Sequence, residues 1–357
     1  MKRIPLYLLS ILFGLITQIR NYFYDKGWFK SFSFPNNKII VVGNLAVGGT
    51  GKSPVVHYLL KNWREVQFPV VLSRGYGRKT KGFLWAKAVE TASTIGDEPL
   101  TYRMAFPNLE LALGENRVKA IQKILTEKPK TQSIILDDAF QHRALRADFN
   151  IVCTTYQRPF YSDELLPLGR LREDISGLNR AQLVLMNKCP NDLSHQEINE
   201  ITFKIQQIAG WEIPVFFTGI RYSEPVSQLA SEPVSQLASE PVGKFFNSPI
   251  LQFYAVAGIA HPELFFSEIA NRFDLIGCKT FPDHYDFTVN DLQEFESKAK
   301  QMSDVQGIIT TQKDYVRLLP YLDEYPHLKA KLSYLPMEMY FIQQEAEFWK
   351  VLGLERN

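Results

Sequence analysis

A glycine-rich segment over residues 43–54, GNLAVGGTGKSP, constrains the fold of this chain more than any other feature. It follows a short β-branched run at 38–42 and precedes apolar residues at helical spacing over 55–63. A buried strand, a glycine loop and a helix in that order direct unpaired backbone N–H groups and the positive end of the helix dipole toward one point. We therefore expect a phosphate-binding loop that opens a helix.

The residues of this loop have separate expected tasks. Glycines let the backbone approach the phosphates closely, Lys52 would reach the β- and γ-phosphates, and the Ser53 hydroxyl would hold Mg²⁺. The residues assigned to the nucleotide are Gly48, Gly49, Thr50, Gly51, Lys52 and Ser53. Ala46 stands where the strict Walker A spacing has glycine, so an ordinary glycine-rich strand-to-helix turn is the alternative.

The composition is that of an ordinary globular protein. With 357 residues, of which 45% are hydrophobic and 22% charged, the chain is long enough for two domains with sizeable cores. The net charge of +2 gives no overall attraction to nucleic acid, and we expect no nucleic-acid partner. The three cysteines form no C-x-x-C pair, which fits a reducing compartment.

The N-terminus carries an apolar stretch without charge over residues 4–19. As a helix these 16 residues would be about 24 Å long, less than the ~30 Å of a hydrocarbon core, so we do not expect the stretch to span a bilayer. Its weakly polar positions share one stripe, and aromatic and basic residues follow over 20–30. We expect a helix that lies in the membrane surface. A cleaved signal peptide and a helix packed on the protein's own core are the alternatives.

Beyond the loop, apolar runs alternate with helical stretches. The runs read as strands are 38–42, 69–72, 109–113, 133–136, 150–153 and 183–186. This alternation predicts an α/β fold, a P-loop NTPase-like doubly wound parallel sheet, with functional residues at the C-terminal ends of its strands.

An octapeptide repeat, SEPVSQLA, occupies residues 223–242. Two copies are too few for a solenoid, and the segment is too polar, with a proline in each copy, for core strands, so we expect an exposed loop insertion. Further apolar runs at 250–256, 307–311 and 339–342 indicate a second, smaller α/β domain. The expected division is a membrane-associated region 1–34, a nucleotide-binding domain 35–215 and a smaller domain 216–357.

Two pairs of carboxylates follow apolar or turn segments. Asp137 and Asp138 end the run 133–136, as a Walker B strand requires for holding Mg²⁺ near Ser53, although an acidic turn would look the same. Asp97 and Glu98 precede a helical stretch. A kinase needs a carboxylate to accept the proton of the acceptor hydroxyl, and Asp97 could serve as this base or as a helix N-cap.

Basic residues cluster on loops that follow predicted strands, where arginine forks match phosphate oxygens. The residues assigned to substrate binding are Asn44, Arg74, Arg78, Arg117, His142, Arg170 and Arg172. His261 follows the run 250–256 at a glycine turn, and taken alone it is a helix-capping or packed histidine.

These segments together resemble the tetraacyldisaccharide 4'-kinase family of lipid A biosynthesis, which are inner-membrane-associated P-loop kinases. The resemblance lies in seven blocks in order, at 42–54, 73–78, 96–99, 136–143, 167–173, 258–262 and 310–314. It covers the chain from the apolar N-terminus to about Leu318. Ser53 stands where the family commonly has threonine, and the octapeptide repeat is additional.

The resemblance implies transfer of the γ-phosphoryl group of ATP to the 4'-hydroxyl of a tetraacylated glucosamine disaccharide 1-phosphate. It implies that Asp97 is the base, assisted by His261 on the hinge side of the second domain. The implied catalytic set is Asp97, His261, Lys52, Asp137 and Asp138, and the implied metal ligands are Ser53, Glu98 and Asp138. It also implies a monomer at the cytoplasmic face of the bacterial inner membrane, with ATP and Mg²⁺ as cofactors and a lipid A precursor as partner.

Two other classes share the P-loop. A GTPase switch or metallochaperone would carry Asn-Lys-x-Asp to read guanine, but Asn187-Lys188-Cys189-Pro190 and Gln312-Lys313-Asp314 both miss this spacing. A membrane scaffold with a vestigial P-loop would leave the acidic and basic residues without a task.

Overall fold

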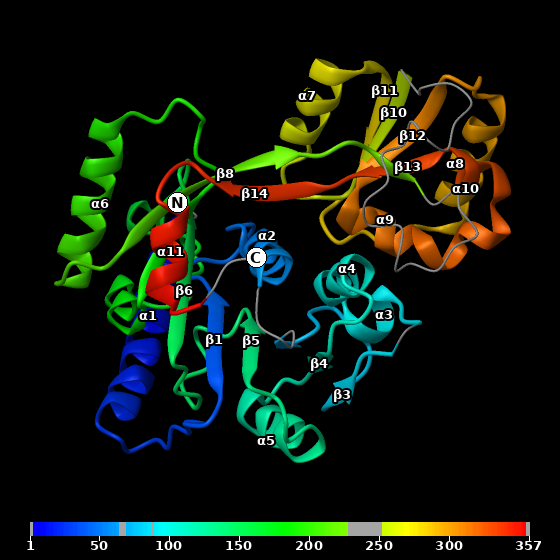
Figure 1. The fold of residues 1–357 in the computed structure, drawn as a ribbon. Helices are drawn as coiled ribbons and strands as arrows, with labels where there is room; N and C mark the ends of the chain where they lie inside the picture. The colour runs from blue at the N-terminus through cyan, green and yellow to red at the C-terminus, as the bar shows by residue number, and fades with distance from the viewer. Residues whose placement is uncertain (1–2, 64–68, 88, 228–251, 355–357) are drawn as a thin grey trace.

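The computed structural model describes residues 3–63, 69–87, 89–227 and 252–354. These residues form two β-sheets with helices on their faces, and a long helix at the N-terminus (Figure 1). Most of the expected octapeptide insertion at 223–242 lies outside the described residues.

The larger sheet has nine strands in the order β14-β8-β7-β6-β1-β5-β2-β4-β3. Its strands are β1 (Lys38–Gly43), β2 (Val70–Ser73), β3 (Leu84–Trp85), β4 (Leu111–Leu113), β5 (Ser133–Asp137), β6 (Phe149–Thr155), β7 (Leu183–Asn187), β8 (Val215–Tyr222) and β14 (Met337–Phe341). The strands between β8 and β4 pair in parallel, whereas β3 and β14 at the two edges pair antiparallel. The C-terminal ends of β1, β5, β6 and β7 therefore meet at one edge.

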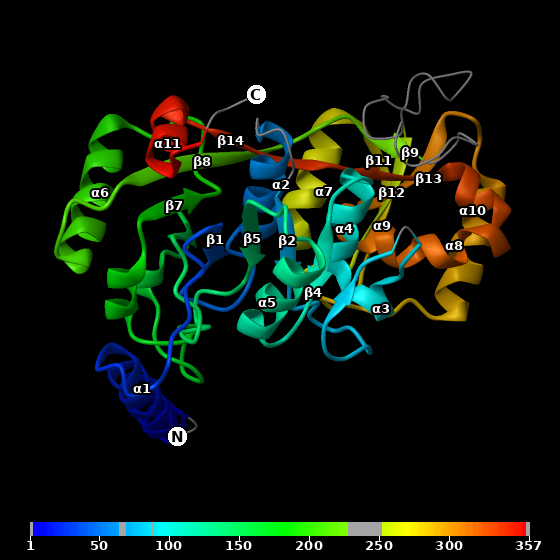
Figure 2. The same ribbon diagram turned by 60° about the horizontal axis from the view of Figure 1, so that its bottom comes forward.

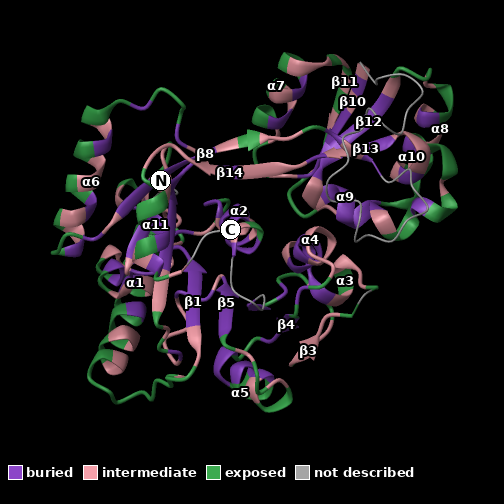
Figure 3. Ribbon diagram, in the orientation of Figure 1, coloured by how far each residue is buried: buried purple, intermediate pink, exposed green. Residues whose placement is uncertain are grey.

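Both faces of this sheet are covered, which explains its uninterrupted apolar strands (Figure 3). Along β1, Ile39 and Val41 enter one core and Ile40 and Val42 enter the other, and all four are buried. The helices of this part are α2 (Lys52–Asn62), α3 (Ala92–Ile95), α4 (Asp97–Ala105), α5 (Arg117–Glu127), α6 (His195–Ala209) and α11 (Glu345–Leu352), with short 3-10 turns at Phe160–Ser162 and Ile175–Arg180. The doubly wound α/β architecture expected from the sequence is confirmed.

The smaller sheet has the order β11-β10-β12-β13-β9. Its strands are β9 (Val226–Ser227), β10 (Gln252–Ala257), β11 (Asp274–Thr280), β12 (Gln306–Thr311) and β13 (Leu332–Leu335). Its helices are α7 (Pro262–Arg272), α8 (Val289–Gln301), α9 (Gln312–Leu318) and α10 (Pro326–Lys331), with a 3-10 turn at Leu319–Glu324. One apolar cluster lies on each face of this sheet.

The chain passes between the two sheets twice. It leaves the larger sheet through β8 and returns through β14, and these strands pair over Tyr222↔Met337 to Thr218↔Phe341 (Figure 1). Residues 337–352 therefore pack with the larger sheet, where Phe348 and Trp349 of α11 join the core beside α2. The division expected at 215 and 216 placed this last segment in the smaller domain, because the run at 339–342 shows no sign of which sheet it joins.

The N-terminal helix α1 (Arg3–Asp25) extends away from the body of the protein (Figure 2). It continues beyond the charge-free stretch, so it is longer than expected from the sequence, and Pro5–Asp25 is long and apolar enough to cross a membrane. Its large apolar side chains point to solvent, with Leu8 62% and Ile16 58% exposed. Its weakly polar side chains instead face the protein, since Ser10 Oγ donates to Leu165 O (2.7 Å) and Asn21 Nδ2 donates to Glu173 Oε2 (2.8 Å). These exposures contradict the packed-helix alternative.

Candidate nucleotide and acceptor site

The loop between β1 and α2 has the backbone shape that its glycines permit. Gly48 and Gly51 adopt φ values of +101° and +86°, in the left-handed region that favours glycine, and Gly51 caps the N-terminus of α2. Gly51 also packs closely on β7, because a Cβ at this position would lie 2.7 Å from Asn187 Nδ2. Lys52 and Ser53 form the first turn of α2. The expected strand, glycine loop and helix N-terminus are all present.

Three amide side chains hold this loop in place. Asn44 Nδ2 donates to Thr50 Oγ1 (2.8 Å), and Asn187 Nδ2 at the end of β7 donates to Thr50 O (2.7 Å). Gln141, which follows β5, donates through Nε2 to Asn44 O (2.7 Å). Asn44 is fully buried, so it contacts the loop from the interior of the protein.

The segment 170–172 runs beside the loop. Val47 N donates to Arg170 O (2.8 Å) and Arg172 N donates to Leu45 O (2.8 Å). The Arg170 side chain reaches the loop itself, because a Cβ on Gly48 would lie 3.4 Å from its Nη1. Arg170 Nε is fixed by Asp163 Oδ2 at 3.0 Å.

Asp138 lies beside the first turn of α2. Lys52 Nζ is 3.8 Å from Asp138 Oδ1, and Arg172 makes two hydrogen bonds to the same carboxylate at 2.8 and 3.1 Å. Two cations on one carboxylate favour its ionised form, so the pKa of Asp138 lies below its usual range although burial opposes this.

Asp137 is the more buried member of the pair. Burial and the neighbouring Asp138 charge raise its pKa to about 7. Tyr102 of α4 donates its hydroxyl to Asp137 Oδ2 (3.2 Å), and the Ser53 side chain lies near the same hydroxyl. A buried carboxylate whose pKa is raised by a neighbouring charge, with a serine side chain close to it, is an environment that a bound cation would stabilise.

The donor set fits Mg²⁺ in its chemistry, since hydroxyl and carboxylate oxygens are the ligands that this ion prefers. Among the described residues, no group of three or more histidine, cysteine or acidic side chains could hold a metal by itself. Mg²⁺ bound here would therefore take only part of its shell from the protein and the rest from nucleotide oxygens and water, as is usual in kinases.

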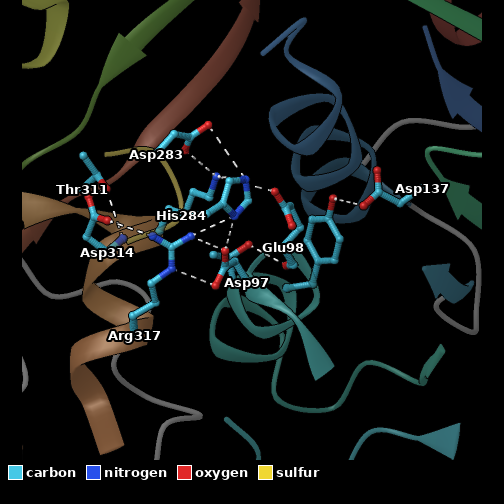
Figure 4. Close-up of polar contacts among 11 residues, drawn as sticks. Asp97, Glu98, Asp137, Asp283, His284, Thr311, Asp314 and Arg317 are labelled. Atoms are coloured by element: carbon cyan, nitrogen blue, oxygen red, sulfur yellow. Dashed lines mark hydrogen bonds and ion pairs between the residues drawn. The ribbon is translucent and has the colours of Figure 1, made fainter. Parts of the chain in front are cut away.

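Asp97 lies at the contact between the two domains, at the start of α4 (Figure 4). Arg317 of α9 holds its carboxylate through two contacts, Nε to Oδ1 at 2.9 Å and Nη2 to Oδ2. His284 Nδ1 lies 2.8 Å from Asp97 Oδ2. Burial alone would raise the pKa of Asp97, but the hydrogen bonds from Arg317 and His284 outweigh it and hold the pKa well below its usual range.

His284 lies between two groups that can only donate. Lys313 Nζ is 2.9 Å from His284 Nε2, and Arg317 Nη2 is 3.1 Å from His284 Nδ1. Nδ1 also faces Asp97 Oδ2, so a neutral ring with its proton on Nδ1 satisfies both Lys313 and Asp97. Lys313 Nζ is also 3.2 Å from Asp283 Oδ1 and 3.9 Å from Glu98 Oε1. Figure 4 shows Glu98 between Asp97 and Asp137, so α4 carries acidic groups toward both domains.

The second domain positions Arg317 through a buried carboxylate. Asp314 Oδ2 accepts hydrogen bonds from Gly258 N (2.8 Å) and from Thr311 Oγ1 (2.7 Å), and Asp314 Oδ1 lies 3.3 Å from Arg317 Nη1. Asp314 is fully buried. The block 310–314 in the sequence therefore supports the residue that grips Asp97.

His261 is an exposed N-cap of α7, and no hydrogen bond between described residues joins it to Asp97, so its assistance to Asp97 stays a prediction. The histidine that contacts Asp97 in this structure is His284. It follows β11 in the segment FPDHYDF, and its flanking acids are the only signal in the sequence that could have pointed to it. Arg317 was missed because nothing local distinguishes it from other helix arginines.

The expected substrate arginines separate into two groups. Arg117 is 2% exposed, and its Nη2 donates to Asp137 O (3.3 Å). His142 is close enough to Arg117 and Arg74 for their charges, together with burial, to lower its pKa to about 4. Arg78 is engaged elsewhere, with Gly82 O and Glu115, so it stabilises its own loop and is not among the residues that gather at the site.

Comparison with known proteins finds relatives that match nearly the whole chain. The sequence profile of the family described as Tetraacyldisaccharide-1-P 4'-kinase matches residues 2–354. Tetraacyldisaccharide 4'-kinase from Flavobacterium johnsoniae is 40% identical over 339 residues, which cover 95% of this chain and 93% of the relative. The protein of the same name from Bacteroides thetaiotaomicron is 37% identical over 346 residues, which cover 96% and 90%.

A solved structure is also similar. The "apo" form of LpxK from Aquifex aeolicus in complex with ATP has a TM-score of 0.72 and 27% identity, and the match covers 99% of both chains. None of these relatives supports the GTPase alternative. The chain therefore belongs to the tetraacyldisaccharide-1-P 4'-kinase family.

Proposed function

We propose that this chain transfers the γ-phosphoryl group of ATP to the 4'-hydroxyl of a tetraacylated glucosamine disaccharide 1-phosphate, a step of lipid A biosynthesis. The family match and the ATP-bound structural neighbour support the activity and the nucleotide. One observation carries the site: helix α4 faces both halves of it. Its first residue, Asp97, meets the second domain, and Tyr102 one turn later bonds Asp137 beside the P-loop.

The P-loop side would hold the triphosphate. The amides around Gly49 to Gly51 and the Lys52 ammonium neutralise the phosphates, which is where most of the rate enhancement of phosphoryl transfer arises. Ser53, Asp138 and Glu98 would hold Mg²⁺, with Asp137 beside them, and the ion would supply charge neutralisation between the β- and γ-phosphates.

Asp97 would act on the acceptor hydroxyl. Its low pKa keeps the carboxylate ionised, so it orients the hydroxyl through a hydrogen bond. The hydroxyl becomes strongly acidic only as its oxygen bonds to phosphorus, and a weak base suffices to take the proton at that stage. His284, with its proton on Nδ1, and Arg317 together hold the Asp97 carboxylate in place. The lone pairs of Asp97 that they leave unoccupied would accept the hydrogen bond of the acceptor hydroxyl.

The cluster of Arg74, Arg117 and His142 would bind a phosphate of the acceptor. Arg117 is buried against the backbone of Asp137, which places this positive charge next to the carboxylates of the site. The low pKa of His142 keeps its imidazole neutral at pH 7, so it would serve as a hydrogen-bond partner while the arginines supply the charge.

Helix α1 would hold the protein at a bilayer. Its polarity is reversed relative to a surface helix of a soluble protein: Ser10 and Asn21 face the body and the leucines and isoleucines face outward. Because these contacts tie α1 to Leu165 and Glu173, a helix that crossed the bilayer would have to leave them. We therefore favour a helix lying at the membrane surface, on the cytoplasmic side where ATP is available, next to a substrate anchored by its acyl chains.

Polar substitutions on the outer face of α1 test this membrane contact. The double variant Leu8→Asn/Ile16→Asn should lose most of its binding to anionic lipid vesicles, because each side chain is more than half exposed and would be buried in lipid. Vesicle flotation measures the bound fraction. Phe203→Asn, at an equally exposed site on α6, should bind as the unmodified protein does. Undiminished flotation of the double variant would contradict a role of α1 in membrane binding.

The activity itself is tested directly with purified full-length protein. Incubation with γ-labelled ATP and detergent-dispersed tetraacyldisaccharide 1-phosphate should move the label to the lipid, as thin-layer chromatography would show. Label released only as inorganic phosphate would indicate an NTPase without an acceptor and would overturn the proposal.

A further inference from the structure

The end of β7 contacts the P-loop from the side opposite the catalytic acids. Asn187 is 1% exposed, and it bridges the loop to the next strand: its Nδ2 donates to Thr50 O (2.7 Å) and its Oδ1 accepts from Thr218 Oγ1 (2.6 Å). The backbone at this point is therefore fixed relative to the residues that meet the triphosphate.

Lys188 follows with a left-handed backbone, φ +58°, which is uncommon outside glycine. This turn directs its side chain to the loop, where a Cβ on Gly49 would lie 3.7 Å from Lys188 Nζ. Within the described parts of the chain, no hydrogen bond or ion pair involves this ammonium group. Burial and the charge of nearby Arg170 lower the pKa of Lys188. A half-buried cation without a counter-group is costly, and the cost is accounted for if a ligand supplies the partner.

The strand order defines which part of a nucleotide would reach Lys188. Asp137 ends β5 on one side of β1 and Asp138 follows it, and α4 brings Asp97 to that same side through the Tyr102 contact. The transferred phosphate must face the acceptor and its base, so it points toward β5. The remainder of the nucleotide then extends in the other direction along the C-terminal edge, over β6 and β7.

We propose that Lys188 is a binding residue for the nucleoside of ATP, with its ammonium donating to ribose oxygens and its aliphatic stem lying against the base. The inference rests on the proposed function, because it takes the direction of the nucleotide from the position of Asp97. The segment Asn187-Lys188-Cys189-Pro190 thereby gains a task that its failed guanine-reading spacing had left open. Proline at 190 provides no carboxylate to select guanine. Lys188 would therefore contact the nucleoside without a hydrogen bond to the edge of the base.

Lys188→Met tests the proposal, since methionine retains an unbranched stem and removes the charge. Isothermal titration of the full-length protein would give its affinity for ATP and, separately, for inorganic tripolyphosphate, which has no nucleoside. We expect the affinity for ATP to fall about ten-fold, the loss typical of a charged hydrogen bond, and the affinity for tripolyphosphate to stay within two-fold. Lys130→Met, at an exposed lysine before β5, is the matched control and should change neither value.

The other outcomes overturn the proposal. Equal losses for ATP and tripolyphosphate would show that Lys188 grips the phosphate chain, and unchanged ATP affinity would show that it does not meet the nucleotide. Lys52→Ala separates this result from failure of the proposed function, because a P-loop lysine serves both ligands. If Lys52→Ala binds both as the unmodified protein does, the P-loop assignment fails, whatever Lys188→Met shows.

Discussion

Replacement of Lys52 by alanine is expected to lower the rate of phosphoryl transfer by several orders of magnitude, because positioning and charge neutralisation supply nearly all catalysis in this reaction class. Lys52 begins α2, and its ammonium lies 3.8 Å from Asp138, so it faces the place where both the phosphates and the metal would bind. Steady-state transfer from γ-labelled ATP to the lipid acceptor measures the effect.

A lysine on the same helix provides the control. Lys61 lies in the last turn of α2, its side chain is 61% exposed, and it pairs with Glu338 on the surface. Lys61→Ala should retain nearly full activity, since exposed ion pairs contribute little to stability. Near-normal turnover of Lys52→Ala would mean that the loop does not hold the reacting nucleotide.

Asp97→Asn is expected to lower kcat by a factor of about 10² to 10⁴ while changing KM for ATP little, because a base acts in the transition state and the P-loop binds ATP. Asparagine keeps the shape of the side chain, so Arg317 and His284 retain a neighbour of the same size. Initial rates over a range of ATP concentrations separate the two constants. A raised KM with unchanged kcat would instead place Asp97 in nucleotide binding.

Variants of His284 and His261 test which of the two histidines assists Asp97. His284→Gln should lower kcat, since it removes the hydrogen bond to Asp97 Oδ2, whereas His261→Gln should not, since His261 is an exposed helix cap. Initial rates of the two variants, measured side by side, make the comparison. The reverse pattern would show that His261 assists Asp97 in a closed form of the enzyme.

The sequence predicts those parts of the fold in which neighbouring residues of one continuous segment form the complete pattern of the element. The strand at 38–43, the glycine loop and helix α2 follow one another without interruption, and the acids at 137 and 138 end an apolar strand. The short strands β3 and β9 and the half-exposed β11 were not predicted, because two residues or an alternating edge strand give too little apolar pattern to detect. The strands β8 and β13 were not predicted either, although most of their residues are buried.

The parts of the site that remained hidden depend on contacts between distant residues. Asp97 and Arg317 are 220 positions apart, and Asp97 and His284 are 187 apart. The choice between His261 and His284 is decided by how the second domain docks against α4, and a single sequence does not contain that geometry. The sequence shows that the weakly polar residues of α1 form one stripe along the helix. That this polar stripe, and not the apolar face, packs on the protein follows only from the contacts of Ser10 and Asn21.

The return of the chain through β14 has a consequence for biosynthesis on the ribosome. Until residues 337–352 have been translated, β8 lacks its antiparallel neighbour, and Tyr58 of α2 lacks the aromatic cover of Phe348 and Trp349. The first domain to emerge is thus the last to be completed, and a nascent chain paused near residue 336 exposes an unpaired apolar edge on β8. Removal of residues 337–352 should accordingly destabilise the nucleotide-binding domain more than the smaller domain. The glycine loop that identifies the nucleotide-binding domain nevertheless lies near the other end of the chain.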